Sequence, residues 1–388
     1  MKESIQIRNV GPLKDIQMDD IKPLTVLIGE SASGKSTLMK VIILMRYVYK
    51  MLNIRSYLKN AGLSKSPFRL RIDSLLSDDL IVYLKGNDTA YIHYSVSIND
   101  HSYFVEFSNG DLNTDGAINI PNEDLFFLKE SWISESRSVI PMWTSKAAVN
   151  KKAELGFYFH ETLSDFEKAT ESIKDLSLEY VGMNLHVVGQ NGKRKYYVEP
   201  KDQSYGQLEL KYASSGIQTS TPLVTLVHYF ANEFSFKDAG RRSILSYLFE
   251  QDRLSSYRPE MEIMDMKKQV HIHVEEPELS LFPDAQCKLI DEVVKTALQN
   301  KDDDRALDVM MATHSPYIVN YMNVLLYQNK IGRGKVSASQ LGVFRLFDGR
   351  LQNLLVQTAE GHWLVNTEDM TEQMKAIYSE YSSLIEDR

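Results

Sequence analysis

Residues 26–37 read VLIGESASGKST, an apolar run that leads into the pattern G-x-x-x-x-G-K-S, and an apolar stretch follows at 38–49. This order predicts a buried strand, a glycine-containing loop and a helix, which is the structural context of a phosphate-binding loop, or P-loop. Because Gly29 and Gly34 have no side chains, backbone N–H groups can turn toward a phosphate, and the helix N-terminus adds partial positive charge. We therefore expect a nucleoside triphosphate to bind here.

Two polar side chains of this loop have expected roles. Lys35 would reach the β- and γ-phosphates as a point charge, and the Ser36 hydroxyl would complete the Mg²⁺ shell with phosphate oxygens. The alternative is a Gly/Ser turn before a core helix, but the complete pattern in its proper context favours the nucleotide site. The predicted nucleotide-binding residues of the loop are Gly29, Glu30, Ser31, Ala32, Ser33, Gly34, Lys35, Ser36 and Thr37.

The composition is that of a globular protein. The 388 residues are enough for two or three domains, or for one large head with an inserted module. Apolar residues make up 43% and charged residues 25%, which are average values. The formal charge of −8, from 44 basic and 52 acidic residues, argues against a surface that binds nucleic acid everywhere, but a local basic strip stays open.

The sequence indicates a cytoplasmic protein with no membrane partner. Cys287 is the only cysteine, so neither an internal disulfide nor a cysteine-based zinc cluster can form, which fits a reducing compartment. Residues 1–9 lack an apolar signal core, and the longest apolar runs, such as 41–45, are far too short to span a membrane.

The spacing of apolar residues predicts an α/β fold. Strands are expected at 4–8, 23–28, 270–274 and 307–312, and an antiparallel β patch at 69–72, 81–84, 91–98 and 103–107. Helices are expected at 161–180, 284–298 and 369–384, the last with its apolar face in the core. A hairpin is expected from 181–188 and 195–198, with its turn at 189–192. We divide the chain into an N-terminal lobe (1–145), a helical insertion with the hairpin (146–205) and a C-terminal lobe (206–388).

An acidic motif, HIHVEEPE at 271–278, follows a predicted strand. Hydrolysis at a P-loop requires one carboxylate for the metal and one to polarise the attacking water, both expected at the end of a strand next to the P-loop strand. We assign Glu275 to the metal and Glu276 to the general base, while Pro277 ends the strand. The alternative is an acidic turn after a core strand, and the P-loop favours the catalytic interpretation.

A histidine follows the next apolar strand, in THSP at 313–316. The strand would deliver His314 to the same sheet edge, where its imidazole can hydrogen-bond the γ-phosphate or the attacking water. His271 and His273 alternate within their own strand with no cysteine or third ligand nearby in sequence, so we interpret them as packed strand residues and not as zinc ligands.

The order of these motifs resembles a known family. The P-loop, SSGIQ at 214–218, VEEPELSLFP at 274–283 and ATHSP at 312–316 resemble the ABC-type AAA ATPase head shared by RecF, SMC proteins and the OLD family. The OLD-like and PtuA-like ATPases of bacterial anti-phage systems are the most similar. The resemblance covers 1–50 and 205–330.

The resemblance implies an α/β P-loop head with a mixed sheet, an antiparallel β patch and a short inserted helical region. It also implies that Ser214, Ser215 and Gly216, at a helix start, contact the γ-phosphate held by the opposite protomer.

Three departures from the family pattern stand out. The family has a glutamine near the metal, yet no glutamine occurs between Gln17 and Gln190, so this ligand is unassigned. The segment 278–283 lacks the usual aspartate, which leaves coupling across a dimer open. Arg137, in the sequence SESR, resembles a short arginine-bearing motif of the defence ATPases, although a salt-bridged surface arginine is the commoner outcome.

The resemblance implies a Mg²⁺-dependent ATPase that forms a head-to-tail dimer or higher oligomer around ATP and regulates a separately encoded effector, a nuclease or toxin, in anti-phage defence. The 72 residues after Pro316 (388 − 316) show no carboxylate cluster of the TOPRIM kind, so we expect no nuclease domain within this chain. The alternative is a RecF-like or SMC-like repair ATPase that clamps DNA through Lys193, Arg194, Lys195, Arg241 and Arg242. An ABC transporter motor fits poorly.

Overall fold

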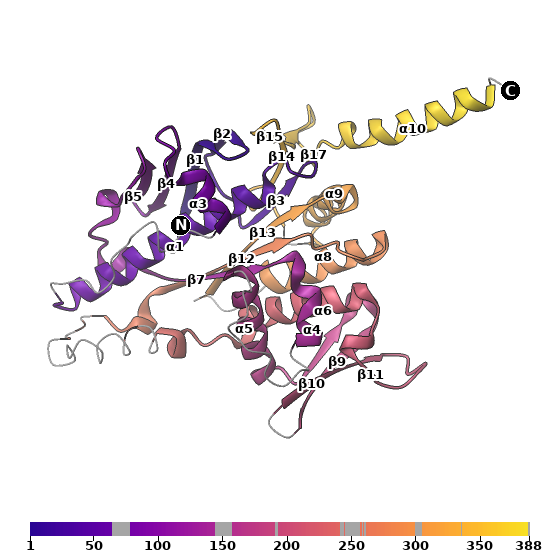
Figure 1. Ribbon diagram of the computed structural model, residues 1–388, viewed down its shortest axis with the longest axis horizontal. Coiled ribbons are helices and arrows are strands. Elements are labelled where there is room, and N and C mark those ends of the chain that lie inside the picture. The colour runs from indigo at the N-terminus through magenta and orange to yellow at the C-terminus, as the bar shows by residue number, and fades with distance from the viewer. Residues whose placement is uncertain are drawn as a thin grey trace.

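The structure is a computed structural model that describes residues 1–63, 78–143, 157–190, 193–240, 244, 257, 259, 261–298, 305–334 and 336–386. It confirms the α/β fold with a mixed sheet (Figure 1). One sheet has eleven strands in the order β6-β5-β4-β1-β2-β15-β14-β3-β13-β12-β7. The strand predicted at 69–72 lies outside the described residues.

Half of this sheet is built from parallel strands whose carboxyl ends meet at one edge. The P-loop strand β3 (Leu24–Ile28) pairs in parallel with β13 (Arg305–Thr313) and with β14 (Leu341–Phe347). Next to β13 lie β12 (Lys267–Glu275) and then β7 (Phe126–Ile133), also parallel. The prediction that the acidic motif ends a strand adjacent to the P-loop strand is therefore wrong, because β13 lies between them.

The other half confirms the antiparallel patch. It consists of β1 (Lys2–Val10), β2 (Leu13–Met18), β4 (Tyr91–Ile98), β5 (His101–Ser108) and β6 (Asp111–Asn113), and β15 (Arg350–Asn353) joins it to β14. The strand predicted at 81–84 is wrong: these residues end helix α3 (Asp78–Leu84). A run of four apolar residues has too few positions to separate a strand from a short helix by its periodicity.

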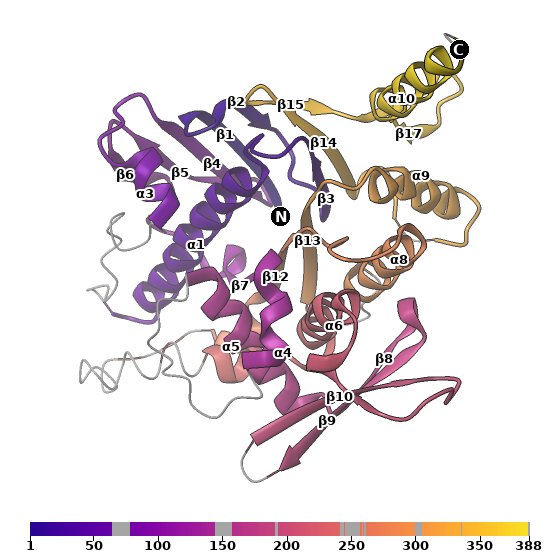
Figure 2. The ribbon, with the colours of Figure 1, turned by 45° about the vertical axis from the view of Figure 1, so that its right-hand side comes forward.

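Helix α1 (Lys35–Asn60) begins in the P-loop and is longer than the apolar stretch 38–49. Figure 2 shows α1 on one side of the sheet, with α6 (Ser215–His228), α8 (Pro283–Leu298) and α9 (Pro316–Lys330) on the other. Although β1 and β12 are far apart in strand order, the Glu3 carboxylate of β1 lies 3.7 Å from the imidazole of His271 in β12. The sheet therefore curls around α1 and buries it.

The segment predicted as a helical insertion contains α5 (Phe157–Ser172) and three strands of a four-stranded sheet in the order β11-β10-β9-β8, while β11 lies just beyond residue 205. The hairpin is confirmed by β9 (Met183–Gln190) and β10 (Lys193–Pro200), but the helix predicted to reach residue 180 ends at Ser172. Strand β8 (Asp175–Leu178) follows it and pairs with β9, so tertiary pairing overrides the helical spacing there. The three-part division of the chain stays a prediction.

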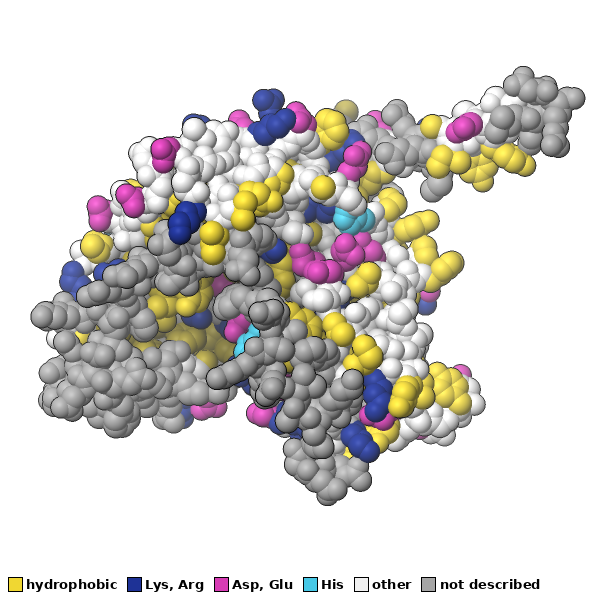
Figure 3. Space-filling view, in the orientation of Figure 1, with side chains coloured by type: hydrophobic (Ala, Val, Ile, Leu, Met, Phe, Trp, Pro, Cys, Tyr) yellow, Lys and Arg dark blue, Asp and Glu magenta, His cyan; other side chains and the backbone are white. Residues whose placement is uncertain are grey.

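Helix α10 (Glu368–Glu386) forms where a helix was predicted, but it points away from the rest of the molecule (Figure 1). Ile377, Tyr378 and Tyr381 are 65%, 69% and 61% exposed, and hydrophobic side chains line one side of this helix in Figure 3. The prediction that its apolar face belongs to the core is wrong.

The remaining elements are short. They are α4 (Ile140–Trp143), β11 (Leu208–Glu209), β16 (Leu355–Gln357), β17 (Trp363–Val365), the 3-10 helices η1 (Asp115–Ala117), η2 (Asn122–Asp124), η3 (Glu135–Val139), η4 (Glu179–Val181), η5 (Leu210–Tyr212) and η8 (Ile263–Asp265), and the π-helix η6 (Tyr229–Glu233). None of the helices that the structure describes combines the length and the hydropathy of a membrane-spanning segment.

Candidate nucleotide site

Three of the four predicted motifs, the P-loop, the acidic motif and the histidine motif, meet at the carboxyl edge of the parallel strands, around a cavity of about 720 Å³. Figure 3 shows acidic side chains gathered beside a histidine on this face of the molecule. The cavity brings together the loop from Ser31 to Thr37, both predicted carboxylates and the predicted histidine. Its lining residues are Pro12, Ser31, Ala32, Ser33, Gly34, Lys35, Ser36, Thr37, Lys40, Tyr83, Glu135, Glu275, Glu276, Ala312 and His314.

The P-loop has the backbone of an anion cradle. Gly34 has φ +101° and Ala32 has φ +60°, so two residues of the loop adopt the left-handed conformation. A Cβ at Gly29 would lie 2.5 Å from the Leu346 carbonyl oxygen, so no other residue fits there without a shift. The Ser33 hydroxyl is buried and has no hydrogen-bond partner among the residues that the structure describes, which leaves a polar group available to a ligand. These features fit a bound phosphate chain.

Lys35 is 6% exposed and donates hydrogen bonds to the carbonyls of Gly29 (2.8 Å) and Glu30 (2.9 Å). Burial lowers the pKa of the Lys35 ammonium, while the charges of Glu276 and Glu278 oppose that shift. Gly29 and Glu30 thus contribute carbonyls that hold the lysine across the loop, and the ammonium can exchange them for phosphate oxygens.

A pair of carboxylates lies beside Ser36. Burial, and then a hydrogen bond with Glu135, raise the pKa of Glu275 to about 8, and a hydrogen bond with Ser36 opposes the rise. The same bond from Glu275 holds the pKa of Glu135 below its usual value. The two carboxylates therefore share a proton across this wall of the cavity. Two carboxylates and a hydroxyl form an all-oxygen donor set, which fits a magnesium ion.

Glu135 is the site residue that the sequence interpretation missed. It begins η3, two residues after the end of β7, the strand that pairs with the strand of Glu275. Its carboxylate shares a hydrogen bond with that of Glu275 at the cavity wall. Pro12, Lys40 and Tyr83 also line the cavity without having been predicted, and Tyr83 comes from α3, the helix that we expected to be a strand.

Glu276 turns back toward the neighbouring strand. Its backbone has φ +43°, a rare conformation for a residue with a side chain, and its N–H donates to the Ala312 carbonyl at 2.8 Å. The Glu276 carboxylate lies 3.9 Å from His314 Nε2, and both side chains are more than one-third exposed. The carboxylate predicted to be the general base and the predicted histidine thus lie within reach of one water at the cavity wall.

Glu278 holds the loop that carries His314. Its carboxylate accepts hydrogen bonds from Thr313 Oγ1 (2.8 Å) and from the His314 N–H (2.6 Å). His271 and His273 are buried strand residues, as predicted: His271 Nδ1 lies 2.7 Å from Glu130, and His273 contacts the Ser131 carbonyl at 3.2 Å.

The SSGIQ segment (214–218), which we call the signature segment, lies at the N-terminus of α6, outside the cavity. Ser214 is the N-cap residue, Ser214 and Ser215 are exposed, and the Ser214 side chain makes no capping hydrogen bond. Gly216 packs against the chain after the acidic motif, where a Cβ would lie 2.7 Å from the Ser280 carbonyl oxygen. One copy of the chain therefore does not bring these three residues to its own cavity.

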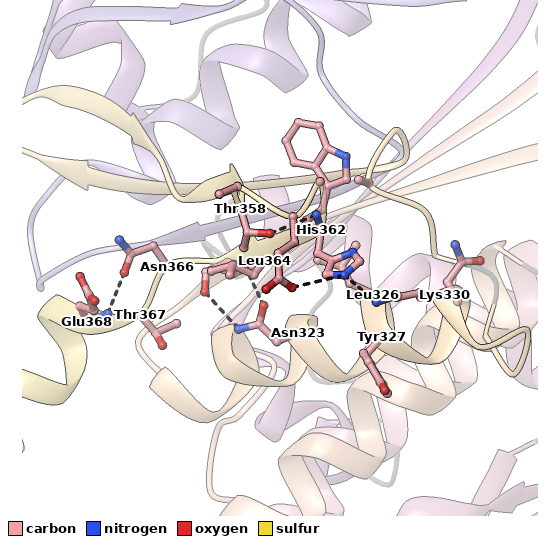
Figure 4. A pocket seen from close by; sticks show the side chains of 17 residues that line it. Asn323, Leu326, Tyr327, Lys330, Thr358, His362, Leu364, Asn366, Thr367 and Glu368 are labelled. Atoms are coloured by element: carbon pink, nitrogen blue, oxygen red, sulfur yellow. Dashed lines mark hydrogen bonds and ion pairs between the residues drawn. The ribbon is translucent and has the colours of Figure 1, made fainter.

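A larger cavity of about 1000 Å³ lies elsewhere, between α9 and β17 (Figure 4). Asn323 bonds to the Val365 backbone at 2.7 and 3.1 Å, and Lys330 lies 3.0 Å from His362. None of the predicted site residues lines this cavity. Its size alone does not make it the nucleotide site, and several of its polar groups are bonded to each other.

Comparison with known families identifies a domain. Residues 144–319 match the AAA ATPase domain, a range that contains the signature segment, the acidic motif and His314 but not the P-loop. The match covers less than half of the chain. Together with the P-loop cavity, it supports an ATPase of the AAA class.

Solved structures that resemble the chain include an SMC head domain from Thermotoga maritima, RecF with a bound ATP analogue, and the ADP conformation of MJ1267, an ATP-binding cassette of an ABC transporter. Their identities are 11%, 10% and 11%, with TM-scores of 0.37, 0.36 and 0.31. The alignments cover 92%, 91% and 91% of this chain and 100%, 98% and 90% of the other chains. At such low scores these similarities carry no inference of their own. A comparison with curated proteins finds no match.

Proposed function

We propose that the protein is an ABC-type ATPase whose two copies close around ATP and Mg²⁺. The observation that carries this proposal is the composite nature of the site. The P-loop, Glu275, Glu276 and His314 line one cavity, whereas Ser214 and Ser215 are exposed outside it. A second copy, placed head to tail, would bring its α6 N-terminus to the γ-phosphate, where the helix dipole and its free N–H groups favour negative charge.

Within this site each group has a distinct task. The P-loop amides and Lys35 would hold the phosphates, and Ser36, Glu275 and Glu135 would hold the magnesium ion. A bound magnesium ion would balance charge on the β- and γ-phosphates. Glu276 would accept a proton from the attacking water, and His314 would orient that water or the γ-phosphate. Hydrolysis would then release the second copy.

The nucleotide-driven dimer would act as a switch on another protein. By the family resemblance of its motifs, we propose that this partner is a separately encoded nuclease or toxin of a cytoplasmic anti-phage system. A DNA-clamping repair ATPase is equally compatible with the ATPase assignment. Of the DNA contacts predicted for that alternative, Arg194 is engaged within the protein, because it donates to the Glu167 carbonyl at 2.6 Å and to Glu171 at 2.7 Å. Arg241 and Arg242 lie outside the described residues.

We call the closure of two copies around ATP the clamp. It is tested with Glu276→Gln, which keeps the cavity but removes the carboxylate that would act as the general base. Incubated with Mg²⁺ and ATP, this variant should retain unhydrolysed nucleotide and elute as a dimer or larger species in size-exclusion chromatography with light scattering. Glu276→Gln combined with Lys35→Ala is the matched control and should remain in its nucleotide-free state. If Glu276→Gln neither holds ATP nor changes its oligomeric state, the clamp is refuted.

The two roles are separated by DNA binding. Salt-dependent binding of the isolated chain to duplex DNA, lost on replacing Lys193 and Lys195 by Gln, would favour the repair role. Under the defence role, DNA binding is absent, and the locked Glu276→Gln dimer alters the activity of a nuclease encoded beside it.

A further inference from the structure

Arg137 is a fully buried arginine that joins the two halves of the proposed composite site. Its exposed fraction is 0%, and its described hydrogen bonds all run to backbone carbonyls. Nε donates to Thr219 (3.0 Å), Nη1 to Ser134 (3.0 Å) and Glu275 (2.7 Å), and Nη2 to Glu276 (2.6 Å). The surface salt bridge considered from the sequence is therefore wrong.

These bonds tie three elements together. Thr219 belongs to α6 and directly follows the signature segment; Glu275 ends β12; and Ser134 precedes η3, which begins with Glu135. Only a guanidinium, which is planar and carries several N–H donors, can donate to all of these carbonyls together. The guanidinium thus fixes the backbone on both sides of the Glu275–Glu276 peptide bond, next to the left-handed turn at Glu276.

The chain after the acidic motif makes further contacts with α6. Thr219 Oγ1 donates to the Leu279 carbonyl at 2.9 Å, and Gly216 packs against the Ser280 carbonyl. A shift of the α6 N-terminus would therefore be passed both to Arg137 and to residues 279–280. The acidic turn at 275–280 and the N-terminal part of α6 are therefore connected by several contacts, with Arg137 at their centre.

The charge of Arg137 suits this position. Burial lowers its pKa to about 10, but the charges of Glu278, Glu135, Glu276 and Glu275 oppose the shift, so the side chain is a cation at neutral pH. A buried cation whose partners are mostly carbonyls is costly unless its geometry is closely kept. Its bonds therefore constrain where α6 and the acidic turn can lie relative to each other.

We infer that Arg137 is the positioning residue that couples the nucleotide cavity to the N-terminus of α6, the surface on which a second copy would close. Through Arg137, closure of a second copy on the α6 N-terminus would fix the backbone conformation of Glu276. In the opposite direction, nucleotide bound in the cavity would fix the position of α6. This inference rests on the proposed clamp and adds a route by which its two sites communicate.

The test is Arg137→Lys, which keeps the positive charge but removes the planar guanidinium and its several N–H donors. ATP binding to the P-loop of the separate chain should be unchanged. We expect kcat to fall about 100-fold with little change in KM, because a small misplacement of a catalytic group has an effect of this order. In the Glu276→Gln background, Arg137→Lys should also weaken ATP-dependent dimerisation.

A second variant reaches the same unit without touching Arg137. Thr219→Val removes the hydroxyl bond to Leu279 but keeps the carbonyl that Arg137 uses. It should lower kcat in the same direction and by less. It also keeps the inference testable if Arg137→Lys does not fold.

The matched control is Arg305→Lys. Arg305 likewise donates to backbone carbonyls that follow α6, at Phe230 (3.0 Å), Ala231 (3.1 Å) and Phe234 (2.9 Å), but at the end far from the site. It should lower stability without a specific loss of kcat. If Arg137→Lys keeps the wild-type kcat, or if Arg305→Lys loses as much, the coupling is refuted while the clamp stands. If the wild-type protein itself neither binds ATP nor dimerises, the clamp fails first.

Discussion

The shared proton of Glu275 and Glu135 gives the metal-free protein a pH dependence. The pKa of Glu275 is raised from a usual 4.5 to about 8. Between these two pH values the folded protein therefore keeps a proton that the unfolded chain has already released. The free energy of unfolding should therefore fall as pH rises through this window, and the loss is complete above about 8. Glu135 shifts the other way and titrates below this range, so it does not offset the fall.

Glu275→Gln tests this, because the amide mimics the protonated acid. With chelator present, urea denaturation between about pH 6 and about pH 9 should show a smaller loss of stability for the variant than for the wild type. Magnesium with ATP should stabilise the wild type, most strongly at the high end, and the variant much less. Parallel pH profiles for the two proteins would contradict a shared proton at this site.

At the residue scale, the sequence was sufficient where a candidate side chain lies within the complete P-loop pattern or directly follows a recognisable strand. Lys35, Glu276 and His314 were all predicted in this way, and the structure brings them to one cavity. Glu135 escaped because the family pattern calls for glutamine. Strand β7, which delivers it, was also missed, since Lys129 and Glu130 interrupt its apolar run. The burial of Arg137 was not predictable either, because its partners are backbone carbonyls from distant segments.

At the element scale, β15 is joined to β2 through a close contact at Gly349. This glycine has φ +71°, and its carbonyl accepts from the N–H groups of Lys14 (2.9 Å) and Asp15 (3.1 Å). A Cβ there would lie 2.6 Å from the Pro12 carbonyl oxygen. Pro12 in turn lines the cavity and lies against Gly34 of the P-loop, so a shift of this contact would reach the nucleotide site.

Gly349→Ala should therefore lower both stability and ATP affinity. The matched control is Gly110→Ala, with φ +80° and no atom within 4 Å of the added Cβ. The control should lose only the left-handed strain of about 1–2 kcal/mol. Gly349→Ala should lose a further 1–3 kcal/mol, roughly, from the steric clash. Equal unfolding free energies for the two variants, measured in urea, would show that the β2–β15 contact can relax.

The elements that the sequence predicted well are those whose periodicity agrees with their tertiary setting. Helix α8 and strand β13 are buried on the faces that their apolar residues indicate. Helix α5 ends early because the residues after it pair with β9, and α10 leaves its apolar residues exposed. Periodicity shows which face of an element is apolar, but not which other element covers it.

At the scale of the whole molecule, the order of strands could not be predicted from motif order. The acidic motif precedes the histidine in sequence, yet β13 lies between β12 and the P-loop strand. The curl of the sheet around α1 is equally non-local, because it depends on contacts between strands at distant positions. A group of buried charged and polar side chains from β1, α1, β4, β7, β12 and β13 lies inside this curl.

Arg46 of α1 is at the centre of that group. It forms an ion pair with Glu3 of β1, and its Nη1 lies 3.1 Å from His273 of β12, while Tyr94 of β4 donates to Glu3 at 2.6 Å. Although burial opposes it, Arg46 holds the pKa of Glu3 below its usual value. The guanidinium thus connects the antiparallel half of the sheet to the parallel half through α1.

Arg46→Met should lower the free energy of unfolding by about 3–5 kcal/mol, because it leaves the Glu3 carboxylate buried without its cation. Adding Glu3→Gln should restore part of this loss, since the amide carries no charge and still accepts from Tyr94. Lys288→Met is the surface control: it removes an exposed pair with Asp284 and should change stability by less than about 1 kcal/mol. Urea denaturation measures all three. If the double variant is no more stable than Arg46→Met alone, the unpaired charge of Glu3 is not the cause, and the loss must come from the packing of α1 inside the curled sheet.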